Sequence, residues 1–253
     1  MDITQRDKAL RYRLTIEYDG TPFCGWQRQS GQTTVQEVLE VALQTALRQP
    51  IELVGSGRTD TGVHALGQVA HFDTDVTVDT YRLRESLNAL VRPHPISVLG
   101  IEVVPDTFHA RFSAKQRAYL YRIQNTRFPP ALNRDRVWWY VHPLNESAMQ
   151  EAANLLIGKH DLSTFRASGC QAHSPVKTID TITIRRTGVE VCITIKARSF
   201  LYHQVRNIVG SLVYVGCGKW SVADFESAFQ SRDRKRGGET APACGLYFIS
   251  VDF

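Results

Sequence analysis

The order of apolar and polar residues predicts alternating strands and helices along the first half of the chain. From residue 11, apolar and polar side chains alternate in RYRLTIEYD, as in a strand with one buried face. From Val35, apolar residues recur at the spacing of one helical face. The pattern predicts strands at 11–19, 51–55, 67–74 and 96–104 and helices at 35–47 and 79–91.

The first of these helices has signals at both ends. Thr34 and Glu37 have the spacing of a capping box, in which each side chain binds the backbone N–H of the other residue. Pro50 ends the helix because proline cannot continue it. The resulting order, β-α-β-β-α-β, is that of a ferredoxin-like unit.

The second half repeats this order with insertions. Its predicted elements are strands at 117–125 and 245–253, a hairpin at 178–197 that turns at Thr187-Gly188, and helices at 145–158, capped by Asn145, and at 199–216. We therefore expect an α+β fold of two fused ferredoxin-like (βαββαβ) halves related by a pseudo-twofold axis. The sheet should be mainly antiparallel, with helices on one face and a central cleft. The predicted domains are residues 1–110 and 111–253.

Composition narrows the class of protein. The chain has 253 residues, 43% of them hydrophobic and 22% charged, as in ordinary globular domains. Its formal net charge of +5 suggests a polyanionic partner. The polar N-terminal stretch has no apolar segment of a signal peptide, and no apolar run reaches the ~20 residues that span a bilayer. We expect a cytoplasmic protein that does not enter a membrane.

The number and spacing of the cysteines favour reduced thiols over disulfides or a metal site. They stand at positions 24, 170, 192, 217 and 244 and form no C-x-x-C pair, which is not the pattern of a disulfide framework or a zinc site. Cys170 and His173 have the spacing of a ligand pair, but no second pair stands nearby. We therefore expect no metal.

A glycine-rich loop, GSGRTDTGVHALGQ at 55–68, carries one carboxylate, Asp60, and one guanidinium, Arg58. Asp-Thr-Gly occurs in aspartic proteases, but those enzymes need two such triplets because two carboxylates share a proton. This chain has one. The loop also lacks the lysine and the following helix of nucleotide-binding loops. From these residues alone, a tight turn that Asp60 only caps remains an alternative.

The stretch at 111–136 is basic and aromatic. It holds seven basic residues against one acidic residue, with Phe112, Tyr119, Tyr121 and Phe128 among them. Basic side chains neutralise phosphates and aromatic faces stack on unpaired bases, so the stretch favours RNA binding. For one tyrosine taken alone, a half-exposed strand with core tyrosines is the better explanation.

The predicted helix at 199–216 places Arg206 beside an apolar stripe. A guanidinium at that position either reaches out to water or pairs with a buried acid from elsewhere in the fold.

Five motifs resemble, in order and spacing, those of the tRNA pseudouridine synthase A family. They are IEYDGTPFCGWQRQ, GRTDTGVHALGQVAHF, FHARFSAKQRAYLYRI, SFLYHQVRNIVGSLVYVG and GLYFISVDF, and the likeness covers essentially the whole chain. Two residues depart from the family pattern: Thr61 stands where alanine is usual, and Gln204 where methionine usually precedes Val-Arg-Asn.

The resemblance implies an isomerase that breaks the C1′–N1 bond of a uridine in tRNA and rejoins the base through C5. Its target would be positions 38 to 40 of the anticodon stem-loop, and the enzyme would be a homodimer. The resemblance implies that Asp60 is the nucleophile, that Tyr119 lies against the target base and that Arg206 pairs with Asp60. Arg58 would help to hold the nucleotide out of its stack, and Leu246 would line the pocket.

One carboxylate is enough for such a reaction. The substrate carries its own leaving group and its own new nucleophilic carbon, so neither a metal nor a redox cofactor is needed. A hydrolytic glycosidase, by contrast, needs two carboxylates. An arginine partner would keep Asp60 ionised against the desolvation that raises a carboxyl pKa. The alternative function is a non-catalytic RNA-binding protein, in which Asp60 only shapes a turn.

Overall fold

The computed structural model describes residues 9–253. Most of the polar N-terminal stretch, from which we expect no signal peptide, lies outside the described residues. Within residues 9–253, no helix is long and apolar enough to cross a membrane. The described chain divides into two compact units, one that runs to Ala114 and includes Phe253, and one that spans Lys115–Asp252.

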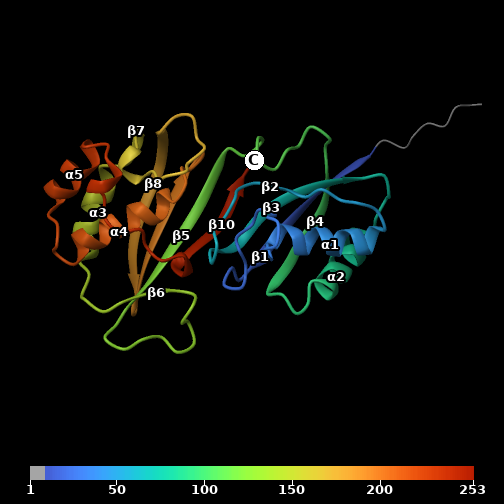
Figure 1. The fold of residues 1–253 in the computed structure, drawn as a ribbon, viewed down its shortest axis with the longest axis horizontal. Coiled ribbons are helices and arrows are strands. Elements are labelled where there is room, and N and C mark those ends of the chain that lie inside the picture. Colours follow the sequence, from blue (N-terminus) through green and yellow to red (C-terminus); the bar gives the residue numbers. More distant parts are fainter. Residues whose placement is uncertain (1–8) are drawn as a thin grey trace, which may run out of the picture. The chain divides into compact units, whose positions relative to one another are not determined.

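The first unit has the predicted order of strands and helices (Figure 1). Its elements are β1 (Leu10–Tyr18), α1 (Val35–Leu47), β2 (Val54–Gly55), β3 (His64–Thr74), α2 (Thr80–Leu90) and β4 (Ile96–Val104). β1 pairs antiparallel with both β3 and β4, and β2 pairs antiparallel with β3. The strand order is therefore β4-β1-β3-β2.

The second unit has the same strand order with additional elements. They are β5 (Gln116–Asn125), β6 (Trp138–Tyr140), α3 (Glu146–Asn154), β7 (Gly158–Asp161), η1 (Ser163–Phe165), β8 (Val176–Thr187), β9 (Glu190–Ala197), α4 (Gln204–Gly216), α5 (Val222–Gln230), η2 (Arg234–Arg236), η3 (Ala243–Gly245) and β10 (Leu246–Asp252), where η marks a 3-10 helix. Antiparallel pairing gives the order β10-β5-β9-β8-β7, and β6 pairs parallel with β5.

These observations confirm the predicted fold class. Each unit has the β-α-β-β-α-β order of a ferredoxin-like fold, and strand pairing is mainly antiparallel. The helices α1 and α2 pack together in the first unit, and α3, α4 and α5 do so in the second.

Helix α1 begins where the sequence predicts. The Thr34 hydroxyl accepts the backbone N–H of Glu37 at 3.3 Å, which is one of the two bonds of the predicted capping box. The helix ends at Leu47 because Arg48 turns into the left-handed backbone region, with φ of 58°, before Pro50 is reached.

The polar side chains of α1 explain why β2 is shorter than the predicted strand at 51–55. Gln36 and Glu40 are both buried, at 8% and 7% exposure. Their side chains bind the C=O and N–H of Leu53, at 3.0 Å each. Because these backbone groups are used by α1, strand pairing begins only at Val54.

Two predicted helices have different bounds. The helix predicted at 199–216 begins at Gln204, because His203 has a φ of 57° that a right-handed helix does not accommodate. The helix predicted at 145–158 ends at Asn154.

The apolar pattern does not predict the strands β6 and β7, the helix α5 or the three 3-10 helices of the second unit. The two strands are too short for a clear alternation, with Trp138–Tyr140 and Gly158–Asp161. Helix α5 does have a signal in the sequence, because Ser221 and Asp224 form a complete capping box.

A histidine in β3 is held neutral by its surroundings. His71 is only 4% exposed, and its Nδ1 accepts the N–H of Ala110 at 3.2 Å. Burial, followed by the electrostatic effects of Arg11 and His109, lowers its pKa to about 4, although Asp73 acts in the opposite direction.

Stability should therefore decrease as the pH falls from about 6.5 to about 4. In this window the unfolded chain protonates His71 while the folded protein does not, so acid favours unfolding by up to ~3 kcal/mol. The measurement is the free energy of unfolding in denaturant across this range. In His71→Asn the amide oxygen replaces Nδ1 as acceptor without titrating, so the decline should be shallower. Identical declines in the two proteins would assign the effect to another group.

Candidate active site

The loop that carries Asp60 connects β2 to β3 and is fixed at its start by a buried glutamine. Gln68 is fully buried in β3; its Oε1 accepts the hydroxyl of Ser56 and its Nε2 donates to the C=O of Gly57, both at 2.8 Å. The N–H of Ser56 donates to the C=O of Val69 at 2.7 Å. The first part of the loop is thus attached to the sheet by backbone and side chain together.

A second attachment lies between the two predicted site residues of the loop. The C=O of Thr59 accepts the N–H of Trp26 at 3.1 Å, and its hydroxyl shares a hydrogen bond of 2.7 Å with Tyr18. Burial raises the pKa of Tyr18 to about 12, so this phenol stays neutral. Because Thr59 lies between Arg58 and Asp60, the backbone that carries both side chains is held in place.

The segment before α1 packs directly against this loop. Gly25 has a φ of 84°, and a Cβ there would lie 2.5 Å from the carbonyl oxygen of Thr59. Any larger residue would displace the loop, so the close approach of the two backbones requires glycine. Asp60 is half-buried, whereas Arg58 is exposed and donates from Nε to Oε1 of Gln27 at 3.1 Å.

The second unit carries the other three predicted site residues. Tyr119 lies in β5 opposite Phe248 of β10, and the residue is 8% exposed. Phe200 and Phe248 meet this ring edge-on, with centroids 5.0 and 5.1 Å away. These two contacts fix the plane of the Tyr119 ring.

Tyr121 differs from Tyr119, although both belong to the strand predicted at 117–125. Tyr121 is fully buried, and its hydroxyl donates to the C=O of Pro242 at 2.7 Å. It is a core residue, as the simpler interpretation of the strand holds. Leu246 lies opposite Tyr121 at the start of β10 and is 5% exposed.

Arg206 lies in the first turn of α4 and is half-buried. Its Nε donates to the C=O of Ala241 at 2.7 Å, and the N–H of Ala241 donates back to the C=O of Arg206 at 3.2 Å. One terminal nitrogen lies 3.3 Å from Nε2 of His203. The guanidinium is thus oriented by the segment that leads from residue 239 into β10.

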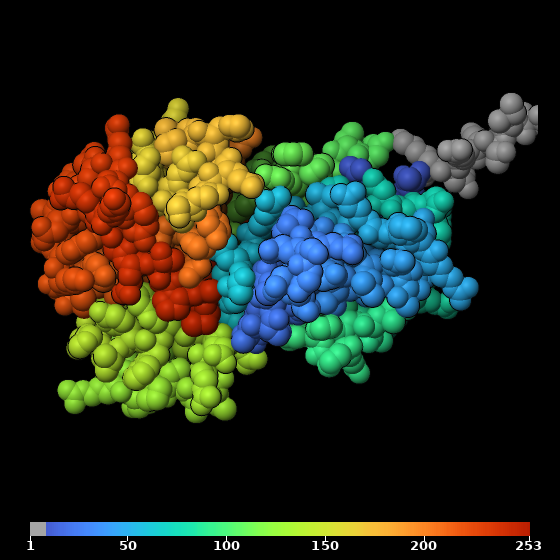
Figure 2. Space-filling model, viewed as in Figure 1, coloured from blue at the N-terminus to red at the C-terminus, as the bar shows by residue number. Residues whose placement is uncertain are grey.

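The basic and aromatic stretch at 111–136 divides into exposed and internal residues. Phe112 and Phe128 are 74% and 67% exposed, and the Arg111 guanidinium lies 5.7 Å from the ring centre of Phe112. The exposed connection between β5 and β6, which includes Phe128, stands out from the second unit in yellow-green in Figure 2. Arg122, by contrast, makes a two-pronged ion pair with Glu190 at 2.7 and 2.9 Å. It is therefore already neutralised within the protein.

Cys170 and His173, which have the spacing of a ligand pair, do not belong to a larger cluster of ligands among the described residues. Cys170 accepts the N–H of Tyr202 at 3.4 Å, and His173 is exposed. Between residues 9 and 253, no group of three or more His, Cys, Asp or Glu side chains is arranged to hold a metal ion. All five cysteines are free thiols.

Arg58 and Asp60 share one loop of the first unit, and Tyr119, Arg206 and Leu246 belong to the second unit. The sequence predicts no role for Tyr18 and Gln68, which hold the loop, or for Gln27, which binds the Arg58 side chain. Tyr18 and Gln27 lie in IEYDGTPFCGWQRQ, the first of the five motifs. Membership of that motif is the signal in the sequence that could have marked them as functional residues.

Comparison with known proteins gives matches in both units. The chain matches the family described as tRNA pseudouridine synthase over residues 14–113 and 152–253. It is 53% identical over 243 residues to a tRNA pseudouridine synthase A of Xanthobacter autotrophicus, covering 96% of this chain and 99% of that protein. It is 53% identical over 245 residues to the protein of that name from Paramagnetospirillum magneticum, covering 96% and 95%. For the one from Rhodospirillum rubrum the identity is 49% over 244 residues, covering 96% and 88%.

Proposed function

This chain belongs to the tRNA pseudouridine synthase family, and from that premise we propose that it acts on positions 38 to 40 of the tRNA anticodon stem-loop with Asp60 as its nucleophile. As a pseudouridine synthase it is an isomerase. The uridine base leaves C1′ through N1, turns, and bonds to C1′ through C5; C5 then loses its proton to water and N1 takes up a proton, so that substrate and product are isomers. No oxygen of water is incorporated and no electron is transferred, so the proposed reaction uses no cofactor.

The observation that best supports this role for Asp60 is the attachment of Thr59 beside it. A nucleophilic or charge-stabilising carboxylate is effective when its position does not have to be established during the reaction. The bonds of Thr59 to Trp26 and Tyr18 supply that rigidity. Attack on C1′, attack on C6 and elimination from the sugar each use one carboxylate, so Asp60 is the reacting group in each of these routes, and it is a nucleophile in the first two.

The other residues act on the nucleotide or on Asp60. A uridine must leave its stack before its glycosidic bond can be reached, which costs a few kcal/mol. We propose that Arg58 helps to hold the extruded nucleotide and that Tyr119, whose ring plane is fixed, stacks on the base. Arg206 is proposed to pair with Asp60 and to keep it ionised, and Leu246 to line the nucleotide pocket.

The proposal extends to the state of the enzyme in the cell. We propose a cytoplasmic homodimer, as the family resemblance implies. The net charge of +5 and the exposed basic residues near Phe112 and Phe128 support tRNA as the polyanionic partner.

Release of tritium tests the function directly. The protein is incubated with tRNA that carries C5-tritiated uridine, and the label released to water is counted. The proposed enzyme releases label because C5 loses its proton, and tRNA with uridine replaced at positions 38 to 40 should release none. Binding of tRNA without release would instead support the non-catalytic RNA-binding alternative.

Two substitutions at Tyr119 separate stacking from proton removal. Tyr119→Phe keeps the ring and Tyr119→Ala removes it, so stacking predicts that only alanine loses ~1–3 kcal/mol of binding. Proton removal predicts that both lose turnover while phenylalanine still binds. A phenol of pKa ~10 is a weak base without activation, so we expect stacking to dominate. Tritium release and tRNA affinity are measured in parallel, and full activity in both variants would make Tyr119 a core residue only.

A further inference from the structure

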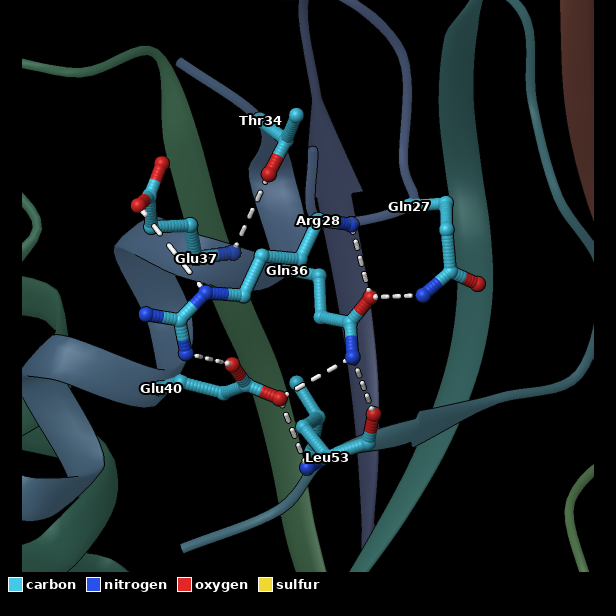
Figure 3. Close-up of polar contacts among 7 residues, drawn as sticks. All are labelled: Gln27, Arg28, Thr34, Gln36, Glu37, Glu40 and Leu53. Carbon is cyan, nitrogen blue, oxygen red and sulfur yellow. Dashed lines mark hydrogen bonds and ion pairs between the residues drawn. The ribbon is translucent and has the colours of Figure 1, made fainter. Parts of the chain in front are cut away.

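We propose that Gln27 is a positioning residue for Arg58 and that a buried network on α1 fixes its orientation. This inference rests on the proposed role of Arg58 in holding the nucleotide. Figure 3 shows the network, in which Gln36 lies between Gln27 and Glu40. Arg58 connects to it because its Nε donates to Oε1 of Gln27 at 3.1 Å.

Backbone groups determine which way the amide of Gln36 points. The C=O of Leu53 can only accept a hydrogen bond, and it receives Nε2 of Gln36 at 3.0 Å. The backbone N–H of Arg28 can only donate, and it binds Oε1 of Gln36 at 2.9 Å. If this amide were reversed, its NH₂ group would face the N–H of Arg28, donor against donor, and its oxygen would face the C=O of Leu53, acceptor against acceptor.

Glu40, on the buried face of α1, favours the same orientation of the Gln36 amide. It is 7% exposed, and its Oε1 accepts both the Leu53 N–H at 3.0 Å and Nε2 of Gln36 at 2.9 Å. Its Oε2 accepts a guanidinium nitrogen of Arg28 at 3.1 Å. The buried carboxylate is thus satisfied on both oxygens, and it requires donors from Gln36.

The orientation then passes to Gln27. Because Oε1 of Gln36 faces it, Gln27 must present its NH₂ group there, and the two atoms lie 2.9 Å apart. Its own carbonyl oxygen is left facing Arg58, which carries donors only. Nε2 and Oε1 of Gln36, followed by Nε2 and Oε1 of Gln27, therefore alternate as donor and acceptor. The last of these atoms, Oε1 of Gln27, accepts the hydrogen bond of the Arg58 guanidinium. This accounts for polar residues buried on α1, where apolar side chains would otherwise be expected.

The test removes this chain of bonds at two points. Gln27→Met keeps side-chain length but has no partner for Arg58, and Gln36→Met leaves Gln27 in place without fixing its amide. Both should lower kcat/KM for tRNA about fivefold to twentyfold. Gln44→Met makes the same change on an exposed position of α1 and should match the parent. Parental activity of the folded Gln27→Met protein would overturn the proposal.

A double-mutant cycle with Arg58→Ala distinguishes positioning from general support of the fold. If Gln27 acts through Arg58, Gln27→Met should have no further effect on kcat/KM in the Arg58→Ala protein. Effects that multiply would show a structural role and overturn the proposal, as would full activity of Arg58→Ala itself.

An NMR measurement keeps this test separate from that of the function. The Nε–H resonance of Arg58 should shift and exchange faster with water in Gln27→Met and Gln36→Met, but not in Gln44→Met. An unchanged resonance in Gln27→Met contradicts the positioning role. Absence of tritium release from the parent protein contradicts the proposed function. The NMR comparison does not depend on turnover, so it still decides whether Gln27 orients Arg58.

Discussion

Asp60→Asn should reduce pseudouridine formation below detection while tRNA affinity stays within about tenfold, ~1.4 kcal/mol. The amide has nearly the size of the carboxylate, so the loop attached through Thr59 and Gln68 should keep its shape. Affinity comes mainly from phosphate contacts and stacking, which the substitution does not alter. An amide has no anionic oxygen for covalent attack or for stabilising positive charge that develops on the sugar.

The comparison uses tritium release, tRNA affinity and a thermal melt of each protein. Asp75→Asn makes the same change at an exposed position after β3 and should retain parental turnover. A folded Asp60→Asn protein that forms pseudouridine at a measurable fraction of the parental rate would show that another group is the nucleophile. A protein that fails to fold would instead favour the interpretation in which Asp60 caps a turn.

Gly210→Ala should lower both stability and turnover. A Cβ at this position of α4 would lie 1.8 Å from the carbonyl oxygen of Glu239, a backbone atom that can move only with its segment. Such overpacking costs ~1–3 kcal/mol and sometimes more. The displaced segment continues to Ala241, which binds the Arg206 guanidinium, so Arg206 should lose its orientation as well.

Denaturant unfolding and tritium release measure the two effects. Gly100→Ala is the control, because a Cβ in this part of β4 would have nothing within 4 Å. Its stability should stay within ~0.5 kcal/mol of the parent. Equal stability of the Gly210→Ala and parent proteins would mean that the 239–241 segment does not pack against α4 as described.

Periodicity was sufficient to predict the fold because each unit has long strands with one buried face. The β1 strand and the helix after Thr34 were predicted nearly to their ends. The spacing of apolar residues does not predict the backbone conformation of an individual residue. The left-handed backbone of His203 shortens α4, and no pattern of apolar residues signals it.

The site was predicted through motifs, whereas the contacts that hold it depend on the tertiary structure. Arg58 and Asp60 stand in one loop, so their proximity was visible in the sequence. The attachment of Thr59 to Tyr18 joins residues 41 positions apart. Gln36 and Glu40 are buried because their partner is the backbone of Leu53, which lies in another element. Such partners become known only when the chain is folded.

The equal strand order of the two units shows which connection of the second unit corresponds to the loop that carries Asp60. A β4-β1-β3-β2 order repeated as β10-β5-β9-β8 is the product expected of an internal duplication. In the second copy the β8–β9 connection is the tight turn at 188–189, whereas the corresponding connection of the first copy, β2–β3, is residues 56–63. Lengthening a hairpin connection costs little free energy and leaves the sheet intact. The longer connection of the first copy therefore gives room for Asp60, the proposed nucleophile, without altering the strand order that the two copies share.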